Sequence, residues 1–437
     1  MRYYLDKNTV TTSIGQNHYS IRNKCDGREV IVDEVGYNII QAIDYRPQTT
    51  TDILRKVIAI YDNIEEEDIL TDLNDFIAFL NQEEFIKQIP ETLEKLQINL
   101  TEKCNERCVH CYIPERKRSK GEGLDYELIR RLINEFSEMG GREIVLSGGE
   151  ALLRQDLDQI IEHAASKGFN ISILSNLTLL TERLVNTLKK YHVDVQTSLY
   201  STNEKIHDAI TGRKGSCKKT KEAIQILCQE GIPVTISCIV MRTNKSDFIG
   251  VLEFGASTGA SVQCNCGLNM DLDFNNKNLL NRLTEEEVRD FYVKLFNYHR
   301  ENDDLDFSLR THNISAMTES LEWYLKQYPC MELHKSCSIN GNGDVCPCGS
   351  FGLVIGNVKA KSLKDIWYEA VSKNEVFNLL NQDMGACGSC QDFEYCYVCP
   401  SIKYNSGKGN FSEQDFYLCR AARIASEVEK EFNMDNN

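Results

Sequence analysis

Alternating and helical hydrophobic patterns in the first 88 residues predict a small α+β domain. Alternating residues on both sides of Gly15-Gln16-Asn17 predict a β-hairpin, and Val30-Ile31-Val32 predicts a further strand. Three segments with apolar residues at helical spacing follow, at about residues 33–43, 53–60 and 69–80. Strands followed by three helices are the order of a winged helix-turn-helix, and we expect residues 1–88 to have that arrangement.

From residue 96 the pattern becomes a strand followed by an amphipathic helix, repeated along the chain. The predicted strands are Leu96–Leu100, Glu143–Leu146, Ile171–Leu174, Val193–Leu199, Val234–Val240 and Ser261–Cys264. Serial strand–helix units predict a parallel sheet with outer helices. Six units cannot close an eight-unit barrel, so we expect an α/β fold with an open, partial (β/α)6 barrel. By the rule for such barrels, the chemistry lies at the carboxyl ends of the strands.

After about residue 310 the alternation fades, and cysteine, glycine and aromatic residues dominate from Cys330 to Cys419. A segment so rich in ligand-type residues and so poor in long apolar runs is expected to fold around metal. The sequence therefore predicts three domains, at residues 1–88, 89–310 and 311–437, the last containing a bridging segment and the cysteine-rich domain.

Composition and charge narrow the class of protein. The formal net charge of −16 disfavours a nucleic-acid partner, and the basic run Arg116–Lys120 is more simply a solvated loop. No run approaches the ~20 apolar residues that a membrane span needs, and the N-terminus lacks a signal-peptide pattern. We therefore expect a cytoplasmic protein without a membrane partner. Eighteen cysteines without an export signal predict metal ligation more than disulfides.

Three cysteines directly follow the first strand of the predicted barrel. Cys104, Cys108 and Cys111 have the spacing C-x3-C-x2-C, which brings three thiolates together within one loop. Three ligands leave the fourth iron of a [4Fe–4S] cluster without a protein partner, and an open metal position can bind a substrate. A structural zinc would want a fourth ligand nearby, and none follows within the loop.

This cysteine motif resembles the signature of the radical S-adenosylmethionine (SAM) superfamily. In that family SAM binds the open iron through its amino and carboxylate groups, and the reduced cluster cleaves SAM to a 5′-deoxyadenosyl radical. The resemblance implies that Gly148, Gly149 and Glu150, at the end of the second strand, hold the SAM amino group. Without that context, Gly-Gly-Glu would be only a turn.

The same resemblance implies three further SAM contacts. Asn176 follows the third strand and Ser198 ends the fourth. The family often has an arginine after the next His-Asp segment. Here Thr211 stands at the usual place, and Arg213 is the candidate for contact with the SAM carboxylate.

The C-terminal cysteines resemble the twin-cluster SPASM domain. The resemblance implies two [4Fe–4S] clusters in addition to the SAM-binding one, with four cysteines each. The first ligand set is Cys330, Cys337, Cys348 and Cys399. The second ligand set is Cys387, Cys390, Cys396 and Cys419. The spacing from Cys396 to Cys399 is one residue shorter than the family pattern, and two structural zinc sites are the alternative.

Three other cysteines keep two interpretations each. Cys264 and Cys266 end a predicted strand on the active face, so they either contact the substrate or pack in the core. Cys346 is either an alternative cluster ligand or a bystander beside Cys348. The sequence assigns no catalytic acid or base.

Residues 1–88 resemble the PqqD-like element that recognises the leader of a precursor peptide by adding the leader as a strand to a sheet edge. The three parts together resemble peptide-maturing radical SAM/SPASM enzymes, including the streptide-type lysine–tryptophan cyclases. The resemblance implies a carbon–carbon cross-link, such as Lys–Trp, in a ribosomally synthesised peptide, with flavodoxin or ferredoxin as reductant. The alternatives are a thioether cross-link, an anaerobic sulfatase maturase and a multi-cluster electron carrier.

Overall fold

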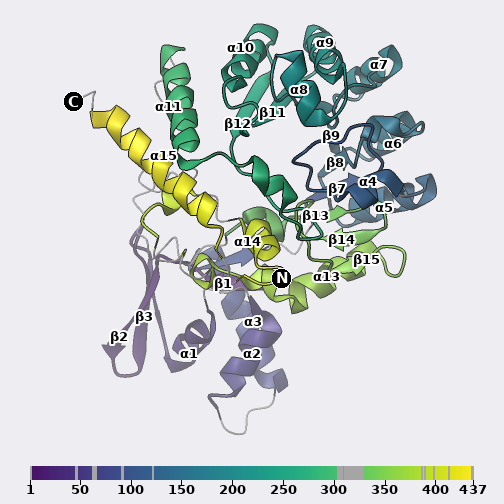
Figure 1. Ribbon diagram of the computed structural model, residues 1–437. Helices are drawn as coiled ribbons and strands as arrows, with labels where there is room; N and C mark the ends of the chain where they lie inside the picture. The colour runs from purple at the N-terminus through teal and green to yellow at the C-terminus, as the bar shows by residue number, and fades with distance from the viewer. Residues whose placement is uncertain are drawn as a thin grey trace. The chain divides into compact units, whose positions relative to one another are not determined.

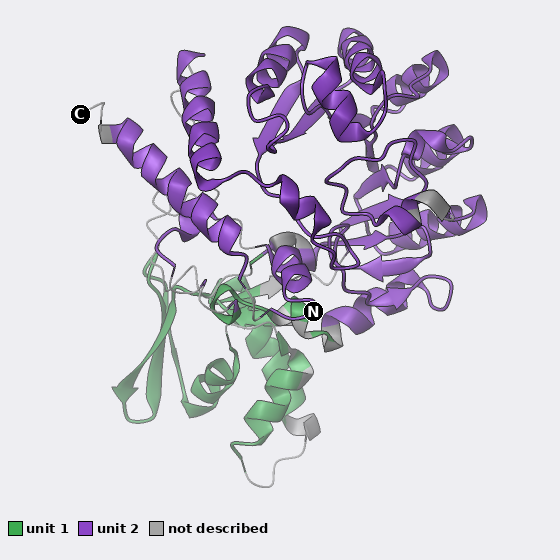
Figure 2. Cartoon of the chain, viewed as in Figure 1, with its two compact units in different colours: residues 1–91, 319–329, 373–383 green, residues 92–318, 330–372, 384–437 purple. Residues whose placement is uncertain are grey.

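The computed structural model describes residues 2–44, 48–61, 66–89, 93–120, 123–302, 309, 329–384, 387, 390–396, 399–411 and 414–434. The chain divides into two compact units (Figure 2). One unit contains residues 1–91, 319–329 and 373–383, and the other contains residues 92–318, 330–372 and 384–437. The predicted N-terminal domain lies within the first unit, and most of the predicted barrel and cysteine-rich domains lie within the second.

The first unit contains the predicted hairpin, which is confirmed. An antiparallel sheet has the order β2-β3-β4, formed by β2 (Thr9–Gly15), β3 (His18–Asn23) and β4 (Glu29–Val32). The hairpin turn needs left-handed backbone at three successive residues, Gly15, Gln16 and Asn17, with φ of 95°, 52° and 56°. The strands β2 and β4 form the two edges of this sheet.

Three helices follow the sheet in the predicted order. They are α1 (Glu34–Ala42), α2 (Thr50–Ile58) and α3 (Glu66–Gln82). Their apolar positions converge on Ile21 of β3 in one core, whose members include Ile40, Ile53, Leu73 and Leu80. A second small sheet of β1 (Arg2–Leu5), β5 (Gln48–Thr49) and β6 (Ile86–Ile89) was not predicted from the sequence.

The second unit is built on one nine-stranded sheet with the order β12-β11-β10-β9-β8-β7-β13-β14-β15. The six predicted barrel strands are all present and parallel. They are β7 (Lys95–Asn99), β8 (Glu143–Ser147), β9 (Asn170–Leu174), β10 (Asp194–Ser198), β11 (Val234–Ile239) and β12 (Ser261–Asn265). The strands β12 and β15 end the sheet on either side, so the predicted open α/β arrangement is confirmed.

Helices connect these strands and lie along one side of them (Figure 1). They are α5 (Tyr126–Glu138), α6 (Leu157–Ser166), α7 (Glu182–Lys190), α8 (Glu204–Thr211), α9 (Ser216–Gln229) and α10 (Phe248–Thr258). In α5, for example, Ile129, Leu132, Ile133 and Phe136 form one buried face. The Asp125 side chain accepts a hydrogen bond from the Leu128 N–H and begins this helix.

The cysteine-rich segment adds strands to the barrel sheet instead of forming a separate one. The strand β13 (Ser336–Ile339) pairs in parallel with β7, and β14 (Asp344–Cys346) and β15 (Gly356–Asn357) continue the sheet in antiparallel fashion. Helices α11 (Glu285–Glu301), α13 (Leu363–Lys373), α14 (Pro400–Ser406) and α15 (Phe416–Met434) complete the unit. Among the described helices, none has the length and apolar character to cross a bilayer.

The prediction of a solvated loop at residues 116–120 is wrong. These residues belong to a short helix, α4 (Glu115–Lys120), and the Arg118 side chain is buried. The loop after β12 packs on the start of this helix, since the Leu272 N–H donates to the Tyr112 carbonyl and Arg116 pairs with Asp273 at 2.5 Å.

Candidate active site

A pocket of about 290 Å³ lies at the carboxyl ends of the barrel strands. Its lining contains most of the predicted SAM and cluster residues of the barrel, namely Cys104, Cys108, Cys111, Gly148, Gly149, Glu150, Asn176 and Ser198. Gly267, Leu268 and Asn269 from the loop after β12 and Ser350 from the cysteine-rich segment complete the wall. Residues predicted from four separate strand ends therefore share one cavity.

The loop that carries the three cysteines is anchored on the end of α8. The Arg107 N–H donates to the Thr211 carbonyl at 2.7 Å, and the Val109 N–H donates to the Ile210 carbonyl at 3.0 Å. The Arg213 guanidinium donates to the Asn105 carbonyl at 3.0 Å and does not line the pocket. In this structure Arg213 therefore supports the backbone of the cysteine loop, and its charge acts on Glu150 although the residue does not line the pocket.

Gly148 and Gly149 are required by a close approach between two loops. A Cβ at Gly148 would lie 2.3 Å from the Thr101 carbonyl oxygen, and one at Gly149 would lie 2.3 Å from that of Lys103. The Gly149 N–H donates to the Thr101 carbonyl at 2.7 Å, so the approach is a hydrogen-bonded one. The absence of side chains at these two glycines thus allows the end of β8 to lie against the segment that leads into the cysteines.

The carboxylate of Glu150 is buried, with 2% of the residue exposed, and its position is fixed by three donors. Oε1 accepts from the Leu152 N–H at 2.9 Å and from the Ser175 hydroxyl at 2.7 Å, and Oε2 accepts from the Asn176 N–H at 2.8 Å. Burial raises the pKa of Glu150, while these bonds and the charge of Arg213 oppose the rise. A carboxylate has about four acceptor positions, so one remains for an ammonium in the pocket.

Asn176 joins the end of β9 to the cysteine loop. Its Nδ2 donates to Asn105 Oδ1 at 2.7 Å, and its Oδ1 accepts from the Thr178 hydroxyl at 2.8 Å. Because its side chain is engaged in this way, Asn176 positions the pocket wall as well as lining it. The Ser198 hydroxyl lies at the opposite wall, within hydrogen-bonding reach of Tyr200.

The three thiols of the loop are shielded from water. Burial raises the pKa of the Cys104 thiol to about 11 and raises those of Cys108 and Cys111 as well. Buried thiols of this kind ionise when they bind metal, because coordination replaces the proton. Among the described residues, no three His, Cys, Asp or Glu side chains could hold a single metal ion. The three sulfurs line the cavity together, as the ligands of a larger multi-iron group would.

Several polar atoms of the pocket wall have no hydrogen-bond partner. Among the described residues, buried side-chain atoms without one include Glu106 Oε1, His110 Nδ1, Arg118 Nε, Thr197 Oγ1 and Asn269 Oδ1, all on residues that line this pocket. Buried polar groups in folded proteins are normally satisfied. The unpaired donors and acceptors therefore fit a cavity that holds a polar, charged ligand such as SAM.

The contacts that Tyr200 makes with two histidines next to the cysteine loop were not identified from the sequence. The Tyr200 hydroxyl lies 3.0 Å from His110 Nε2, and the Tyr200 N–H donates to His207 Nδ1 at 3.2 Å. The His207 ring also stacks on the Tyr200 ring at 5.5 Å between centroids. His207 is therefore a buried residue that supports Tyr200 next to the cysteine loop.

The second predicted set of C-terminal cysteines is gathered in the structure. Burial raises the pKa of Cys396 to about 12, and the charges of Cys419, Cys387 and Cys390 add to the rise, which places all four close together. The buried Lys403 contacts this group, since its Nζ donates to the Met384 carbonyl and lies 3.6 Å from Cys387 Sγ.

The first predicted set is gathered in part. Cys348 lies near Cys399, and the hydroxyls of Ser350 and Ser401 connect the two sulfurs through contacts of 3.4, 3.1 and 3.1 Å. Burial raises the pKa of Cys337, and its thiol neighbour is Cys346. Cys346 therefore lies close to a predicted ligand, and its role as a ligand or bystander stays open.

The thiols of Cys264 and Cys266 do not line the pocket. Cys264 lies beside Cys238 across the β11–β12 pair, and Cys266 is buried with its sulfur 3.9 Å from the Tyr292 hydroxyl. The residues that follow, Gly267 to Asn269, form the pocket wall instead. The structure therefore favours the packing interpretation of both cysteines.

Two protein-family models match this chain, one over most of the barrel and one over the cysteine-rich segment. Residues 98–255 match the radical SAM superfamily, and residues 330–400 match the SPASM iron–sulfur cluster-binding domain. A radical SAM domain implies SAM and a [4Fe–4S] cluster, and an SPASM domain implies auxiliary iron–sulfur clusters. The first match contains the cysteine loop and the Gly-Gly-Glu segment, and the second match begins at Cys330.

Similar proteins act on different substrates. The AdoMet-dependent heme synthase of Methanosarcina barkeri is 25% identical over 343 residues, covering 73% of this chain and 94% of that protein. The PqqA peptide cyclase of Xanthomonas campestris pv. campestris is 25% identical over 292 residues, covering 64% and 74%. The structure of Streptococcus suis SuiB bound to precursor peptide SuiA shares the fold, with a TM-score of 0.57 and 15% identity over 96% of this chain and all of that one. The chain is thus an enzyme with a radical SAM domain followed by an SPASM domain.

Proposed function

We propose that this enzyme forms an intramolecular cross-link, of the carbon–carbon type such as Lys–Trp, in a ribosomally synthesised precursor peptide. The observation that carries the proposal is the single pocket in which Cys104, Cys108 and Cys111 face the Gly-Gly-Glu segment. The peptide cyclase relative and the fold shared with a precursor-peptide enzyme support a peptide as substrate. A thioether cross-link is the nearest alternative.

In this mechanism the chain's own residues hold and orient the reactants. Cys104, Cys108 and Cys111 bind the cluster, and the free acceptor position of Glu150 receives the SAM ammonium. A reduced cluster held there would supply the reductive cleavage of SAM and, through it, the removal of a hydrogen atom from the peptide. We propose that Gly267 to Asn269 and Ser350 meet the peptide, because they line the same pocket without belonging to the predicted SAM residues.

The C-terminal cysteines would hold two auxiliary clusters. Cys387, Cys390, Cys396 and Cys419 form one set, and Cys330, Cys337, Cys348 and Cys399 form the other. Cross-link formation removes two hydrogen atoms from the peptide, one by the radical and one as a proton and an electron. We propose that an auxiliary cluster accepts this electron, and that flavodoxin or ferredoxin reduces the SAM-binding cluster at the start of the cycle.

The N-terminal unit would bind the leader of the peptide on its sheet edge. The strand β4 is an edge strand with Ile31 59% exposed, and its Val32 approaches Gly36 at the start of α1. Phe76 of α3 reaches the start of α1, 3.3 Å from where a Cβ of Gly36 would lie, and the 36% exposed Phe79 stacks on Phe76 at 6.0 Å. An extended peptide on β4 would gain backbone hydrogen bonds and this apolar contact.

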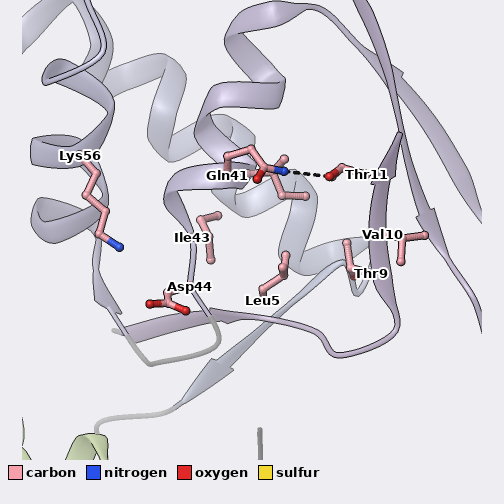
Figure 3. Close-up of a pocket in the computed structure, with 9 residues that line it drawn as sticks. Leu5, Thr9, Val10, Thr11, Gln41, Ile43, Asp44 and Lys56 are labelled. Carbon is pink, nitrogen blue, oxygen red and sulfur yellow. Dashed lines mark hydrogen bonds between the residues drawn. The ribbon is translucent and has the colours of Figure 1, made fainter. Parts of the chain in front are cut away.

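The opposite edge of the same sheet lies beside a pocket whose exposed lining is more polar than apolar, although Ile40 and Ile43 are part of it. This pocket of about 420 Å³ lies beside β2, with Thr9 and Thr11 on one side and Asp44 and Lys56 on the other (Figure 3). The Gln41 amide donates to the Thr11 hydroxyl across it at 2.8 Å. Of the two edges, β4 therefore offers the better surface for an apolar leader segment, and β2 serves as the comparison.

The test uses the full-length enzyme with reconstituted clusters, SAM and dithionite. Short peptides encoded beside the gene serve as candidate substrates, and heme precursors serve the rival activity suggested by the heme synthase relative. The proposal expects 5′-deoxyadenosine together with a peptide that has lost two hydrogen atoms. Absence of 5′-deoxyadenosine would exclude radical SAM chemistry, and a modified porphyrin or a modified sulfatase peptide would replace the proposed substrate.

A further inference from the structure

Among the described residues, Arg118 is a buried cation without a carboxylate partner. The residue is 9% exposed and lines the active-site pocket from α4. Its Nε has no hydrogen-bond acceptor, and no carboxylate forms an ion pair with it among the described residues. The other arginine of the same helix, Arg116, is exposed and pairs with both carboxylate oxygens of Asp273. Among the described residues, Arg116 therefore has a carboxylate partner and Arg118 has none, so the charge of Arg118 is available to a bound ligand.

A buried guanidinium without a counter-charge is strongly unfavourable. The charge of Arg118 acts on the pocket itself, because it opposes the burial that raises the pKa of Cys111 and adds to the burial that lowers the pKa of His110. Arg118 therefore lies close to the third cysteine of the loop. A carboxylate bound there would form the strong, two-pronged contact that suits a guanidinium.

The charges around the pocket match those of a zwitterion. Glu150 and Glu106 supply carboxylates on the pocket wall, and Arg118 is the one lysine or arginine among its described lining residues. SAM carries an ammonium and a carboxylate on the same carbon. If the ammonium lies at Glu150, the carboxylate needs a cation, and Arg213, which donates to the Asn105 carbonyl, is not among the residues that line the pocket.

We propose that Arg118 binds the carboxylate of SAM, in the role that the sequence suggested for Arg213. This inference rests on the proposed function only in requiring that SAM binds this pocket, and it holds for any substrate. It makes Arg118 a cofactor-positioning residue. The cation fixes the end of SAM that approaches the cluster, while Glu150 fixes the ammonium.

The test measures the dissociation constants of SAM and decarboxylated SAM for the full-length, cluster-loaded enzyme by equilibrium dialysis without turnover. Arg118→Met should weaken SAM binding by about tenfold to a hundredfold, the range for a hydrogen bond between charged groups. It should leave the affinity for decarboxylated SAM within about twofold, since the lost partner is absent from that ligand. Arg118→Lys should fall between the two, and Arg116→Met should bind both ligands as the wild type does.

Iron content and absorbance near 400 nm, measured for each variant, separate a lost cluster from a lost contact. Should Arg118→Met lose its iron, Arg118→Lys still carries the comparison, because it retains the charge. The assignment is overturned if Arg118→Met binds SAM normally, if it loses both ligands equally, or if Arg213→Met shows the carboxylate-specific loss instead. A wild-type enzyme that holds its iron but binds no SAM would overturn the proposed function as well, and that result needs no variant.

Discussion

The ammonium group of Lys403 lies 3.6 Å from the sulfur of Cys387, inside the second group of C-terminal cysteines. Lys403 is 5% exposed, and among the described residues no carboxylate pairs with it. Its charge also acts on Cys419, where it opposes the burial that raises the pKa of that thiol. Thiolates bound to a cluster would supply the negative charge that this buried lysine lacks.

Replacing Lys403 by Met should lower the reduction potential of the cluster held by this group. A reduced cluster carries one more negative charge, so a nearby cation favours reduction. Removal of one buried charge–thiolate contact should change the equilibrium constant on the order of tenfold, or about 59 mV for one electron. A potentiometric titration followed by electron paramagnetic resonance measures the shift.

Lys408→Met removes an exposed lysine and should leave the potential unchanged. An unchanged potential in Lys403→Met with full iron content would contradict the prediction.

Gly149→Ala should displace the cysteine loop. The new Cβ would lie 2.3 Å from the Lys103 carbonyl oxygen and 2.4 Å from that of Glu102, and both are backbone atoms. Overpacking of this kind destabilises by about 1–3 kcal/mol, and here the strain falls on the segment that leads to Cys104. We expect a lower thermal midpoint and fewer than the roughly twelve irons per chain that three [4Fe–4S] clusters require.

Gly267→Ala is the matched control for this variant, read by stability and iron content alone. A Cβ there would meet Asn265 Oδ1 at 3.7 Å and Leu418 Cδ2 at 4.0 Å, which are ordinary contacts. If Gly149→Ala kept its iron and its thermal midpoint, the close approach of the two loops would not be needed to hold the cysteines.

Acidification should weaken the barrel through His207. Burial lowers the pKa of His207 to about 4, against an ordinary value of 6.5, and the charge of Asp208 only partly opposes this. Because the folded pKa lies below the unfolded one, the unfolded chain binds the proton first as the pH falls below about 6.5. Stability is therefore lost between pH 6.5 and 4, by about 2 kcal/mol from pH 7 to pH 5.

Urea unfolding of the wild type and of His207→Gln at pH 7 and pH 5 measures the stability that His207 costs on acidification. The glutamine oxygen can still accept the Tyr200 N–H but does not ionise in this range. The variant should therefore lose less stability on acidification than the wild type. Equal losses in the two proteins would assign the pH dependence to other groups, such as His110.

The barrel could be predicted because its information is local. Each of the strands β7 to β11 is a short run with buried positions followed by an amphipathic helix, and the three cysteines and Gly148-Gly149-Glu150 lie at strand ends that the pattern defines. A parallel sheet then brings those ends to one side without further information. The pairing of β13 with β7 was missed because four residues near the end of the chain give no signal of their distant partner.

The burial of Arg118 could not be predicted from the local pattern of residues. The run Arg116–Lys120 has the composition of a solvated segment, yet the structure exposes Arg116 and buries Arg118. The loop after β12, which contains Leu272 and Asp273, packs on this segment from more than 150 residues away. Arg213 illustrates the converse case, since the family resemblance made it a candidate for the SAM carboxylate and the structure shows its guanidinium donating to a backbone carbonyl.

The exposed isoleucines on the two edges of the N-terminal sheet distinguish where a leader peptide binds. Ile31 on β4 is 59% exposed, and Ile14 on β2 is 52% exposed on the opposite edge. Ile31→Lys should raise the dissociation constant of a precursor peptide about tenfold, because loss of one apolar contact removes about 1.4 kcal/mol. Ile14→Lys should leave it unchanged, and both variants should cleave SAM as the wild type does when peptide is absent. Fluorescence anisotropy of a labelled precursor measures the binding. An effect of Ile14→Lys alone would show that the leader binds at β2. If neither variant had an effect, neither edge of this sheet would be the binding site of the leader.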